Sequence, residues 1–363
     1  MHKVPELIIS QREVIKGRGS ISNRGSRYQS LQSFWEDGIE GPSRFTECRP
    51  VTARSVISRN NSPDVPFQLS INPYQGCEHG CTYCYARPTH AYHDLSPGLD
   101  FETRLSFKQN AAQQLRRELA RPAYQCQCIT IGANTDAYQP VEKVHGITRQ
   151  LLQVLQECRH PVAIITKGAL VTRDIDILAE MAADGLSSVA MSITTLDKEL
   201  KRHMEPRAAS ARARIKATEE LARAGIPVTL LFSPVIPGLN DMDMEEIVRL
   251  AAEAGAESAA CMLLRLPLEI SDLFQEWLHQ YYPLKAGRVM SLLRQCRGGR
   301  ENDSRFGHRM RGQGPVAELI SRRFKLACKK QGLAEGERYG GRTDLFRPPG
   351  WEGANREQFD LFS

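Results

Sequence analysis

The chain has 363 residues, of which 41% are hydrophobic and 25% are charged, and its formal net charge is +6. This length and composition are those of a globular protein with one large core or two ordinary ones. No apolar run approaches the roughly 18–20 residues that span a bilayer, and the first residues lack the apolar segment of a signal peptide, so we expect a cytoplasmic protein without membrane contact.

Residues 1–60 are rich in Arg, Ser and Gly and show little apolar periodicity. The run Lys16-Gly17-Arg18-Gly19-Ser20 is typical of this stretch. A segment of this composition has too few apolar side chains to build a core of its own. We therefore expect an extended N-terminal arm that is partly ordered against the rest of the chain.

From residue 67 onward, strand-like and helix-like segments alternate. Short apolar runs occur at 67–72, 128–133, 161–166, 187–193, 227–233 and 257–264. Four of the five gaps hold amphipathic helices, for which we expect N-caps at Asn110, Thr148, Thr172 and Ser210. Alternation at intervals of about thirty residues requires a parallel sheet with right-handed crossovers. The pattern predicts an α/β fold, either an open doubly wound sheet or a partial barrel.

Three cysteines directly follow the first predicted strand. Cys77, Cys81 and Cys84 have the spacing Cys-x3-Cys-x2-Cys, and Tyr83 precedes the third. An ordinary iron–sulfur cluster takes four thiolates, so three would leave one iron open, and an open position distinguishes a chemical metal site from a structural one. The alternative is a structural zinc ion, held by the three cysteines and one of His79, His90 or His93.

Polar residues also follow the later predicted strands. The run Gly132-Ala133-Asn134-Thr135-Asp136 comes after the second strand, Lys167 after the third, Ser192 at the end of the fourth, and Pro237-Gly238 after the fifth. The carboxyl ends of parallel strands share one edge, where such folds place their chemistry. A lysine there could bind a carboxylate as a point charge, and an ordinary surface lysine is the alternative.

The cysteine spacing, with the aromatic Tyr83 before the third cysteine, resembles the signature of the radical S-adenosylmethionine (SAM) superfamily. The resemblance implies a partial (β/α)6 TIM-type barrel and a [4Fe-4S] cluster whose open iron binds SAM. The reduced cluster of that family cleaves SAM to a 5′-deoxyadenosyl radical. The resemblance further implies that SAM is contacted by Tyr83, Asn134, Asp136, Lys167, Ser192, Pro237 and Gly238.

Two segments, 72–77 and 132–136, are similar to those of the spore photoproduct lyase group, and the whole chain resembles a bacterial branch of it. Lyases of that group keep a cysteine near the end of the second strand, which returns a hydrogen atom to the product radical. Here Ala133 stands in the corresponding segment, which argues against spore photoproduct itself as the substrate. We take Tyr85 and Tyr138 as candidate hydrogen donors. The resemblance also implies a lyase that repairs DNA lesions and a reductant such as flavodoxin or ferredoxin.

After residue 265 the alternation stops. We expect helix over 270–296, a Gly/Arg-rich loop over 297–315 and a basic amphipathic helix over 316–331. From Arg297 to Lys330 there are ten Lys/Arg against three acidic residues, a net charge of +7. A positive field of this kind suits a polyanionic partner such as DNA, and a solvated helix face is the alternative.

The chain ends, after a Gly/Pro-rich stretch, in Gln358-Phe359-Asp360-Leu361-Phe362. This peptide resembles the one with which bacterial polymerases and repair proteins dock on the DNA sliding clamp, although an apolar end could also fold back onto its own core. We expect four parts in all: an arm over 1–60, a partial barrel over 61–265, a helical basic extension over 266–335 and a flexible tail over 336–363.

The leading interpretation is thus a radical SAM enzyme that acts on nucleic acid. The first alternative is a radical SAM enzyme with a small-molecule or peptide substrate, whose basic segment is only a solvated face. A steep salt dependence of DNA affinity would separate these two. The second alternative is a non-catalytic, metal-stabilised scaffold recruited to DNA, which cleavage of SAM by the reduced protein would exclude.

Overall fold

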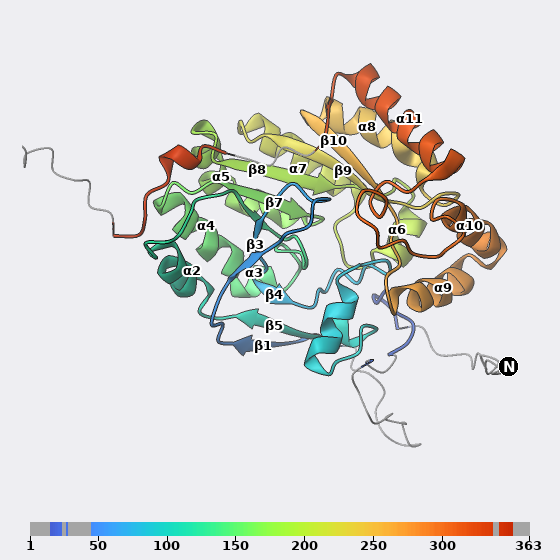
Figure 1. Ribbon diagram of the computed structural model, residues 1–363, viewed down its shortest axis with the longest axis horizontal. Coiled ribbons are helices and arrows are strands. Elements are labelled where there is room, and N and C mark those ends of the chain that lie inside the picture. Colours follow the sequence, from blue (N-terminus) through green and yellow to red (C-terminus); the bar gives the residue numbers. More distant parts are fainter. Residues whose placement is uncertain (1–14, 24–26, 28–44, 337–340, 351–363) are drawn as a thin grey trace, which may run out of the picture.

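A sheet of mostly parallel strands forms the centre of the computed structural model, which describes residues 15–23, 27, 45–336 and 341–350. Its order is β11-β10-β9-β8-β7-β6-β3-β2 (Figure 1), and only the edge pair β2–β3 is antiparallel. The strands are β2 Ile57–Arg59, β3 Leu69–Ile71, β6 Ile129–Ile131, β7 Val162–Thr166, β8 Ser187–Ser192, β9 Val228–Val235, β10 Ser258–Leu263 and β11 Ala334–Glu335.

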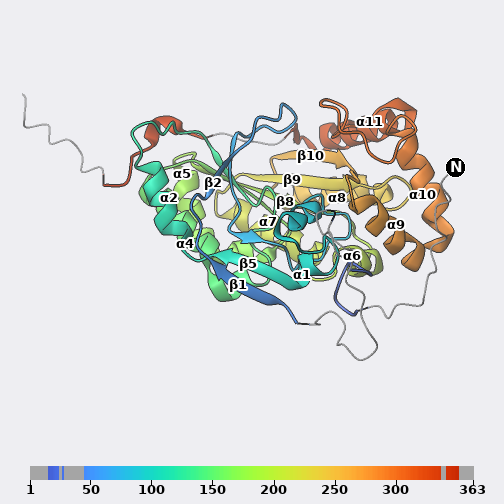
Figure 2. The ribbon, with the colours of Figure 1, turned by 60° about the horizontal axis from the view of Figure 1, so that its bottom comes forward.

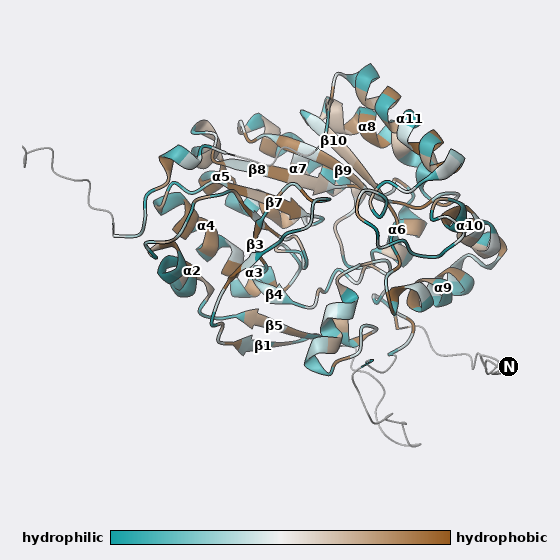
Figure 3. Cartoon of the chain, viewed as in Figure 1, coloured by the Kyte–Doolittle hydropathy of each residue, from teal (hydrophilic) through white to brown (hydrophobic). Residues whose placement is uncertain are grey.

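Six of these strands, β3 and β6 to β10, coincide with the six apolar runs of the sequence, which confirms the predicted α/β partial barrel. Their residues are almost all buried, as in parallel sheets that are covered on both faces. Helices pack on the outer face with their hydrophobic sides inward (Figures 2 and 3). The main ones are α2 Ala111–Leu119, α4 Ile147–Glu157, α5 Ile175–Ala183, α7 Ala211–Arg223 and α8 Met244–Glu253.

Of the four expected N-caps, only Ser210 caps its helix with its side chain, by accepting the amide of the residue three positions later at 3.2 Å. The Asn110 side chain instead bonds the backbone of Ala53, and the Thr148 hydroxyl donates to a loop carbonyl. Thr172 lies in a 3-10 turn, Ala169–Asp174, that precedes α5. Asn110 is nevertheless the N-cap residue of α2, as expected, whereas the expectations for Thr148 and Thr172 were wrong because α4 and α5 begin at other residues.

A small second sheet of order β1-β5-β4 lies beside the barrel (Figure 1). Its strands are β1 Glu47–Val51, β5 Arg104–Lys108 and β4 Tyr74–Gln75. Strands β1 and β2 both fall within the segment expected to be an extended arm, whereas residues 15–23 lack regular structure and lie on the cysteine loop. The remaining short helices are η1 Arg87–His93, α1 Asp100–Thr103, α3 Glu142–His145, α6 Lys198–Met204, η3 Asp241–Asp243 and η4 Thr343–Leu345.

The segment after the barrel contains three helices: α9 Ile270–Tyr281, α10 Pro283–Gln295 and α11 Gly314–Gln331. The expected helix over 270–296 is two helices because Pro283 begins the second, and α11 agrees with the predicted basic helix. Helix α11 packs on α8 and β10, and loop 297–313 meets the end of β10 (Figure 1). None of the helices in the described ranges is long and apolar enough to cross a membrane.

Candidate active site

The cysteine loop lies where β3 and β4 end, at the carboxyl edge of the barrel. The side chains of Cys77 and Cys81 are almost fully buried and that of Cys84 is half-buried, and all three are free thiols. The Cys77 amide donates to the Phe101 carbonyl at 2.8 Å, and the Cys84 amide donates to the Cys81 carbonyl at 3.3 Å. Gly76 has a positive φ of 76°, a conformation that turns the chain sharply and that side chains other than hydrogen rarely allow.

The three thiols fit an iron–sulfur cluster better than a single metal ion. Burial raises the pKa of each thiol, that of Cys81 to about 12, so the trio needs the positive charge of a metal to deprotonate. No three His, Cys, Asp or Glu side chains of the described residues converge closely enough to hold one ion. Tetrahedral zinc, with Zn–S bonds of about 2.3 Å, needs sulfurs about 4 Å apart, whereas each thiolate of a cube binds a different iron.

Asp136 braces the end of the third parallel strand against the cysteine loop. Its carboxylate accepts hydrogen bonds from the Thr166 hydroxyl and the Lys167 amide, both at 2.7 Å, and lies 3.3 Å from Nδ1 of His79. Burial alone would raise the pKa of Asp136, but His79 and these hydrogen bonds lower it below its ordinary value. The carboxylate therefore stays charged, and its predicted contact with SAM remains a prediction.

The structure brings together three of the residues predicted to bind SAM. Nζ of Lys167 lies 2.6 Å from the Ser192 hydroxyl and 5.8 Å from the centre of the Tyr83 ring. These residues come from β7, β8 and the cysteine loop, so only the folded sheet edge unites them. A lysine ammonium beside the thiols suits the carboxylate of a ligand that approaches the cluster.

A buried ion pair behind Tyr83 escaped the sequence analysis. The Tyr83 hydroxyl donates to Glu205, which also accepts from Thr194 at 2.7 Å and from the Arg214 guanidinium. Burial opposes the charge of Glu205, but Arg214 and the hydrogen bonds lower its pKa to about 2. Arg214 also donates to the Ser192 carbonyl at 2.8 Å. No motif connects these positions in the sequence, so only the fold could identify the pair.

The other residues predicted to bind SAM lie on neighbouring strand-end loops. The backbone amide of Asn134 donates to the side-chain oxygen of Asn72 at 2.9 Å. This bond ties the loop after β6 to the segment before the cysteines. Gly238 has a φ of 79° and donates its amide to Asp241 at 2.7 Å, with Pro237 preceding it in the same turn. The described hydrogen bonds connect neither Asn134 nor Gly238 to Lys167, so their contacts with SAM remain predictions.

The two candidate hydrogen donors have different surroundings. Tyr85 follows the third cysteine directly, is 48% exposed, and donates its hydroxyl to the Ala133 carbonyl. Tyr138 is 2% exposed and donates its hydroxyl to Asp174 at 3.0 Å, at the start of α5. Of the two, Tyr85 therefore has the hydroxyl that lies beside the ends of the strands.

The arm segment 18–20 is fastened to the cysteine loop. The Glu102 carboxylate accepts the amides of residues 19 and 20 at 2.9 and 2.8 Å, and it also accepts the Arg87 guanidinium. Nε of Arg87 in turn donates to the Cys81 carbonyl at 2.9 Å. A Cβ on Gly19 would lie 1.7 Å from the Gly80 carbonyl oxygen, so only glycine allows this approach. We call residues 18–20 with Glu102 and Arg87 the arm clasp.

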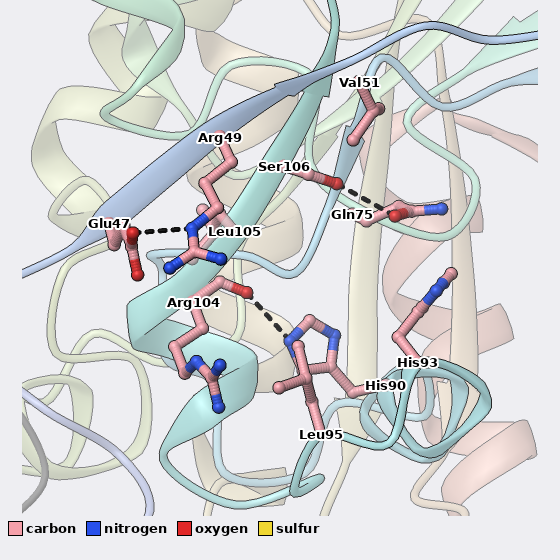
Figure 4. A pocket seen from close by; sticks show the side chains of 10 residues that line it. All are labelled: Glu47, Arg49, Val51, Gln75, His90, His93, Leu95, Arg104, Leu105 and Ser106. Atoms are coloured by element: carbon pink, nitrogen blue, oxygen red, sulfur yellow. Dashed lines mark hydrogen bonds and ion pairs between the residues drawn. The ribbon is translucent and has the colours of Figure 1, made fainter.

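A cavity of about 200 Å³ lies between the small sheet and η1 (Figure 4). Its lining includes Arg49, Arg104 and His93, and the His90 ring bonds the Arg104 carbonyl at 3.0 Å. None of its lining residues comes from the ends of β6 to β10. We therefore assign the cofactors to the strand ends and not to this cavity.

The comparisons with known proteins identify the family of the chain. A family model described as the radical SAM superfamily matches residues 71–251. An uncharacterised protein of Mycobacterium bovis is 35% identical over 247 residues, which cover 67% of this chain and 73% of that protein. A protein of Pseudomonas phage M6 described as a radical SAM Nalpha-GlyT isomerase is 24% identical, over 65% of this chain and 47% of its own.

Among solved structures, spore photoproduct lyase in complex with dinucleoside spore photoproduct superimposes with a TM-score of 0.58. The two chains are 14% identical, and the match covers 83% of this chain and 87% of the lyase. At this identity the likeness shows the fold and not the reaction. The matched family model establishes that this chain belongs to the radical SAM superfamily, whose cofactors are a [4Fe-4S] cluster and SAM.

Proposed function

We propose that this radical SAM enzyme acts on nucleic acid, as a lyase of the kind that repairs DNA lesions. When bound, the cluster and SAM would supply the radical chemistry that removes a hydrogen atom from the substrate. In this proposal Cys77, Cys81 and Cys84 hold the cluster. Lys167 pairs with the carboxylate of SAM, and the Ser192 hydroxyl bonds the ribose.

The observation that carries the nucleic-acid proposal is the unpaired positive charge of the basic segment. Five of its cations are exposed and form no ion pair within the described part of the chain: Arg300, Arg311, Arg322, Lys329 and Lys330. The other five have partners. Arg305, Arg309, Arg323 and Lys325 pair with acidic residues, and Arg297 is buried against backbone carbonyls. The unpaired positive charge of the segment is therefore smaller than its net charge of +7 suggests. It still suits binding to a phosphate backbone.

A structural neighbour supports the same class of substrate. The spore photoproduct lyase described above is a complex with a dinucleoside photoproduct. This chain departs from that group at Ala133, where the group has a thiol, and the Tyr85 hydroxyl is bonded to the Ala133 carbonyl. We therefore assign Tyr85 the return of a hydrogen atom to the product radical: its O–H bond breaks and a C–H bond forms on the product. An electron from the protein reductant and a proton from solvent then restore the phenol.

The test uses the anaerobically reconstituted full chain with labelled SAM and a panel of lesion-bearing DNA. Deuterium transfer between SAM and one lesion, together with DNA affinity that falls steeply with salt, would support the proposal. Formation of 5′-deoxyadenosine that no DNA stimulates, with salt-independent and weak DNA binding, would contradict it. Loss of product but not of SAM cleavage in Tyr85→Phe would support the role of that hydroxyl.

Radical SAM enzymes need a reductant, and we propose flavodoxin or ferredoxin for this one. We also propose that the protein works in the cytoplasm and that the peptide Gln358-Phe359-Asp360-Leu361-Phe362 docks on the DNA sliding clamp. This peptide lies outside the described residues, so the proposal depends on the sequence alone. Tethering to a DNA-bound ring would raise the local concentration of substrate.

A further inference from the structure

We propose that the mouth of the barrel binds an unpaired strand of nucleic acid through four side chains, Tyr85, Arg265, Phe306 and Arg309, which we call the mouth rim. This inference rests on the proposed function and deepens it, because it names the surface that contacts the strand and the state in which the strand is bound. It assigns phosphate contacts to the arginines and base stacking to the aromatic rings.

Arg265 is the first reason for the proposal. It follows β10, and its Nε is buried without a hydrogen-bond partner in the described part of the chain. Its one hydrogen bond there is from NH1 to the thioether of Met310, at 3.7 Å. Guanidinium has five donors in a planar fork that matches phosphate oxygens. A half-buried cation with so few partners destabilises the fold. An anionic ligand would accept hydrogen bonds from the guanidinium donors that the protein leaves unbonded.

The charges around Arg265 do not neutralise it. Burial lowers the pKa of Arg265, and the nearby charge of Arg309 lowers it further, while Tyr85 and Asp64 act in the opposite direction. The Asp64 carboxylate already accepts hydrogen bonds from the Arg309 side chain and from the Gly307 amide. The Asp64 carboxylate is thus already bonded to Arg309 and forms no ion pair with Arg265, and the mouth keeps a net positive charge.

The aromatic side chains of the mouth rim are exposed, which is the second reason. Phe306 is 58% exposed and Tyr85 is 48% exposed. The guanidinium of Arg309 lies 4.6 Å from the centre of the Phe306 ring. Aromatic rings that alternate with arginines are typical of surfaces that bind single strands, where bases stack and the backbone meets cations. A duplex hides the base faces, so these rings favour an unpaired strand.

The mouth rim is held in place from beneath. Arg297 is 1% exposed and donates to the carbonyls of His308 and Arg309, at 3.1 and 2.8 Å. The same guanidinium donates to the carbonyls of Leu263 and Leu264 at the end of β10, at 3.2 and 2.6 Å. This one side chain therefore fixes the turn that carries Phe306 and Arg309 relative to Arg265. A surface that is ordered before binding loses less entropy when a ligand arrives.

The experiment compares two surfaces of the same protein. The reconstituted full chain is titrated against a fluorescent oligothymidylate and against a duplex of equal length, with anisotropy as the readout. Arg265→Gln and Phe306→Ala test the mouth rim, Arg322→Gln tests the outer face of α11, and Arg223→Gln on α7 is the remote control. Iron content and SAM affinity are measured for every variant, since these report the fold and the cofactor site.

We expect Arg265→Gln to weaken single-strand binding about ten- to a hundredfold, the effect of losing a charge-assisted hydrogen bond. We expect Phe306→Ala to weaken it about five- to a hundredfold, the effect of losing one stacked base. Arg223→Gln should bind like the unaltered chain, and all variants should keep their iron and their SAM affinity.

The opposing outcomes are distinct. Equal single-strand binding by Arg265→Gln, Phe306→Ala and the unaltered chain, with loss in Arg322→Gln, would overturn the mouth rim and place the interface on α11, leaving the proposed function intact. Weaker SAM binding in Arg265→Gln would assign that arginine to the cofactor and also overturn the proposal. If the unaltered chain bound neither probe, the proposed function itself would fail.

Discussion

The cysteine loop and loop 297–313 flank the carboxyl edge of the barrel. They differ in whether the buried charges beside them have partners of opposite charge. Around the cysteine loop the buried carboxylates of Glu102 and Glu205 each face an arginine, at Arg87 and Arg214. Beside loop 297–313, Arg265 has no carboxylate partner within the described residues. The cofactor side is therefore neutralised by the protein itself. The side that we propose for the substrate keeps a positive charge that an anionic ligand would neutralise.

Removal of a cysteine ligand is expected to have the largest effect on the cofactor side. Replacing Cys77, Cys81 or Cys84 by Ala should reduce iron from about four atoms per chain to nearly none and abolish the brown colour, since a single cube needs all three thiolates. Iron analysis and the absorption band in the visible range check this. Replacing Cys126, which lies far from the loop in the sequence, is the control, and a colourless unaltered protein with stoichiometric zinc would contradict the prediction.

The buried ion pair between Glu205 and Arg214 on the cofactor side should not tolerate the loss of one of its two residues. Glu205→Ala leaves Arg214 buried without its carboxylate, so we expect a loss of about 3–5 kcal/mol in the free energy of unfolding. Chemical denaturation of the metal-free chain measures it. The control is Glu219→Ala, which breaks an exposed ion pair with Arg223 and should cost no more than about 1 kcal/mol. Similar losses in both variants would show that the buried pair is not special.

The same pair predicts a pH dependence. Because the pKa of Glu205 is lowered from 4.5 to about 2 in the folded chain, its contribution is complete above about pH 4.5 and is lost as the pH falls toward 2. Glu205→Gln should therefore flatten the stability of the metal-free chain over this range. An unchanged acid limb in the variant would contradict the assignment.

A smaller effect is expected where the cofactor side meets its ligand. Lys167→Ala and Ser192→Ala should each weaken SAM binding about ten- to a hundredfold, the equivalent of about 1.5–3 kcal/mol for a charge-assisted hydrogen bond. Equilibrium binding of SAM to the iron-loaded protein measures this, with exposed Lys198→Ala as the control. Unchanged affinity in both variants would place the pocket elsewhere on the edge.

Disruption of the arm clasp should have a still smaller effect on the cysteine loop. Gly19→Ala puts a Cβ against the Gly80 carbonyl, so the arm must shift at a cost of about 1–3 kcal/mol, typical of overpacking. We expect faster release of iron to a chelator and faster tryptic cleavage near Arg18. Gly287→Ala on α10, where a Cβ meets no atom within 4 Å, is the matched control. Equal release rates would show that the arm does not protect the loop.

Deletion of residues 358–363 should leave both sides unchanged. We expect iron content and SAM cleavage at their original values and loss of binding to the purified clamp of the host. Surface plasmon resonance with the immobilised clamp measures this. Equal clamp binding by the full and shortened chains, or none by either, would contradict the proposal that residues 358–362 dock on the clamp.

The barrel and the metal ligands could be predicted because their signals are local. Six apolar runs at regular intervals indicated β3 and β6 to β10, and one short motif indicated the thiols. The partners of the site were beyond the sequence. Glu205 reaches Tyr83 across 122 positions, and Arg309 reaches Asp64 across 245, and no periodicity or spacing connects residues so far apart. The net charge of 297–330 also overestimated the unpaired charge of that segment. It could not show that Arg323 pairs with Asp241, which lies outside the segment.

The arm has a consequence for the order in which the protein matures. Residues 18–22 are synthesised early, but their partners come later in the chain: Glu102 accepts the amides of residues 19 and 20, and Glu276 on α9 accepts the Ser22 hydroxyl at 2.6 Å. The arm therefore cannot close fully until α9 has left the ribosome and folded. The bonds of residues 19 and 20 need only Glu102, whereas the bond of Ser22 needs Glu276, so the arm is fastened in two stages that follow the order of synthesis.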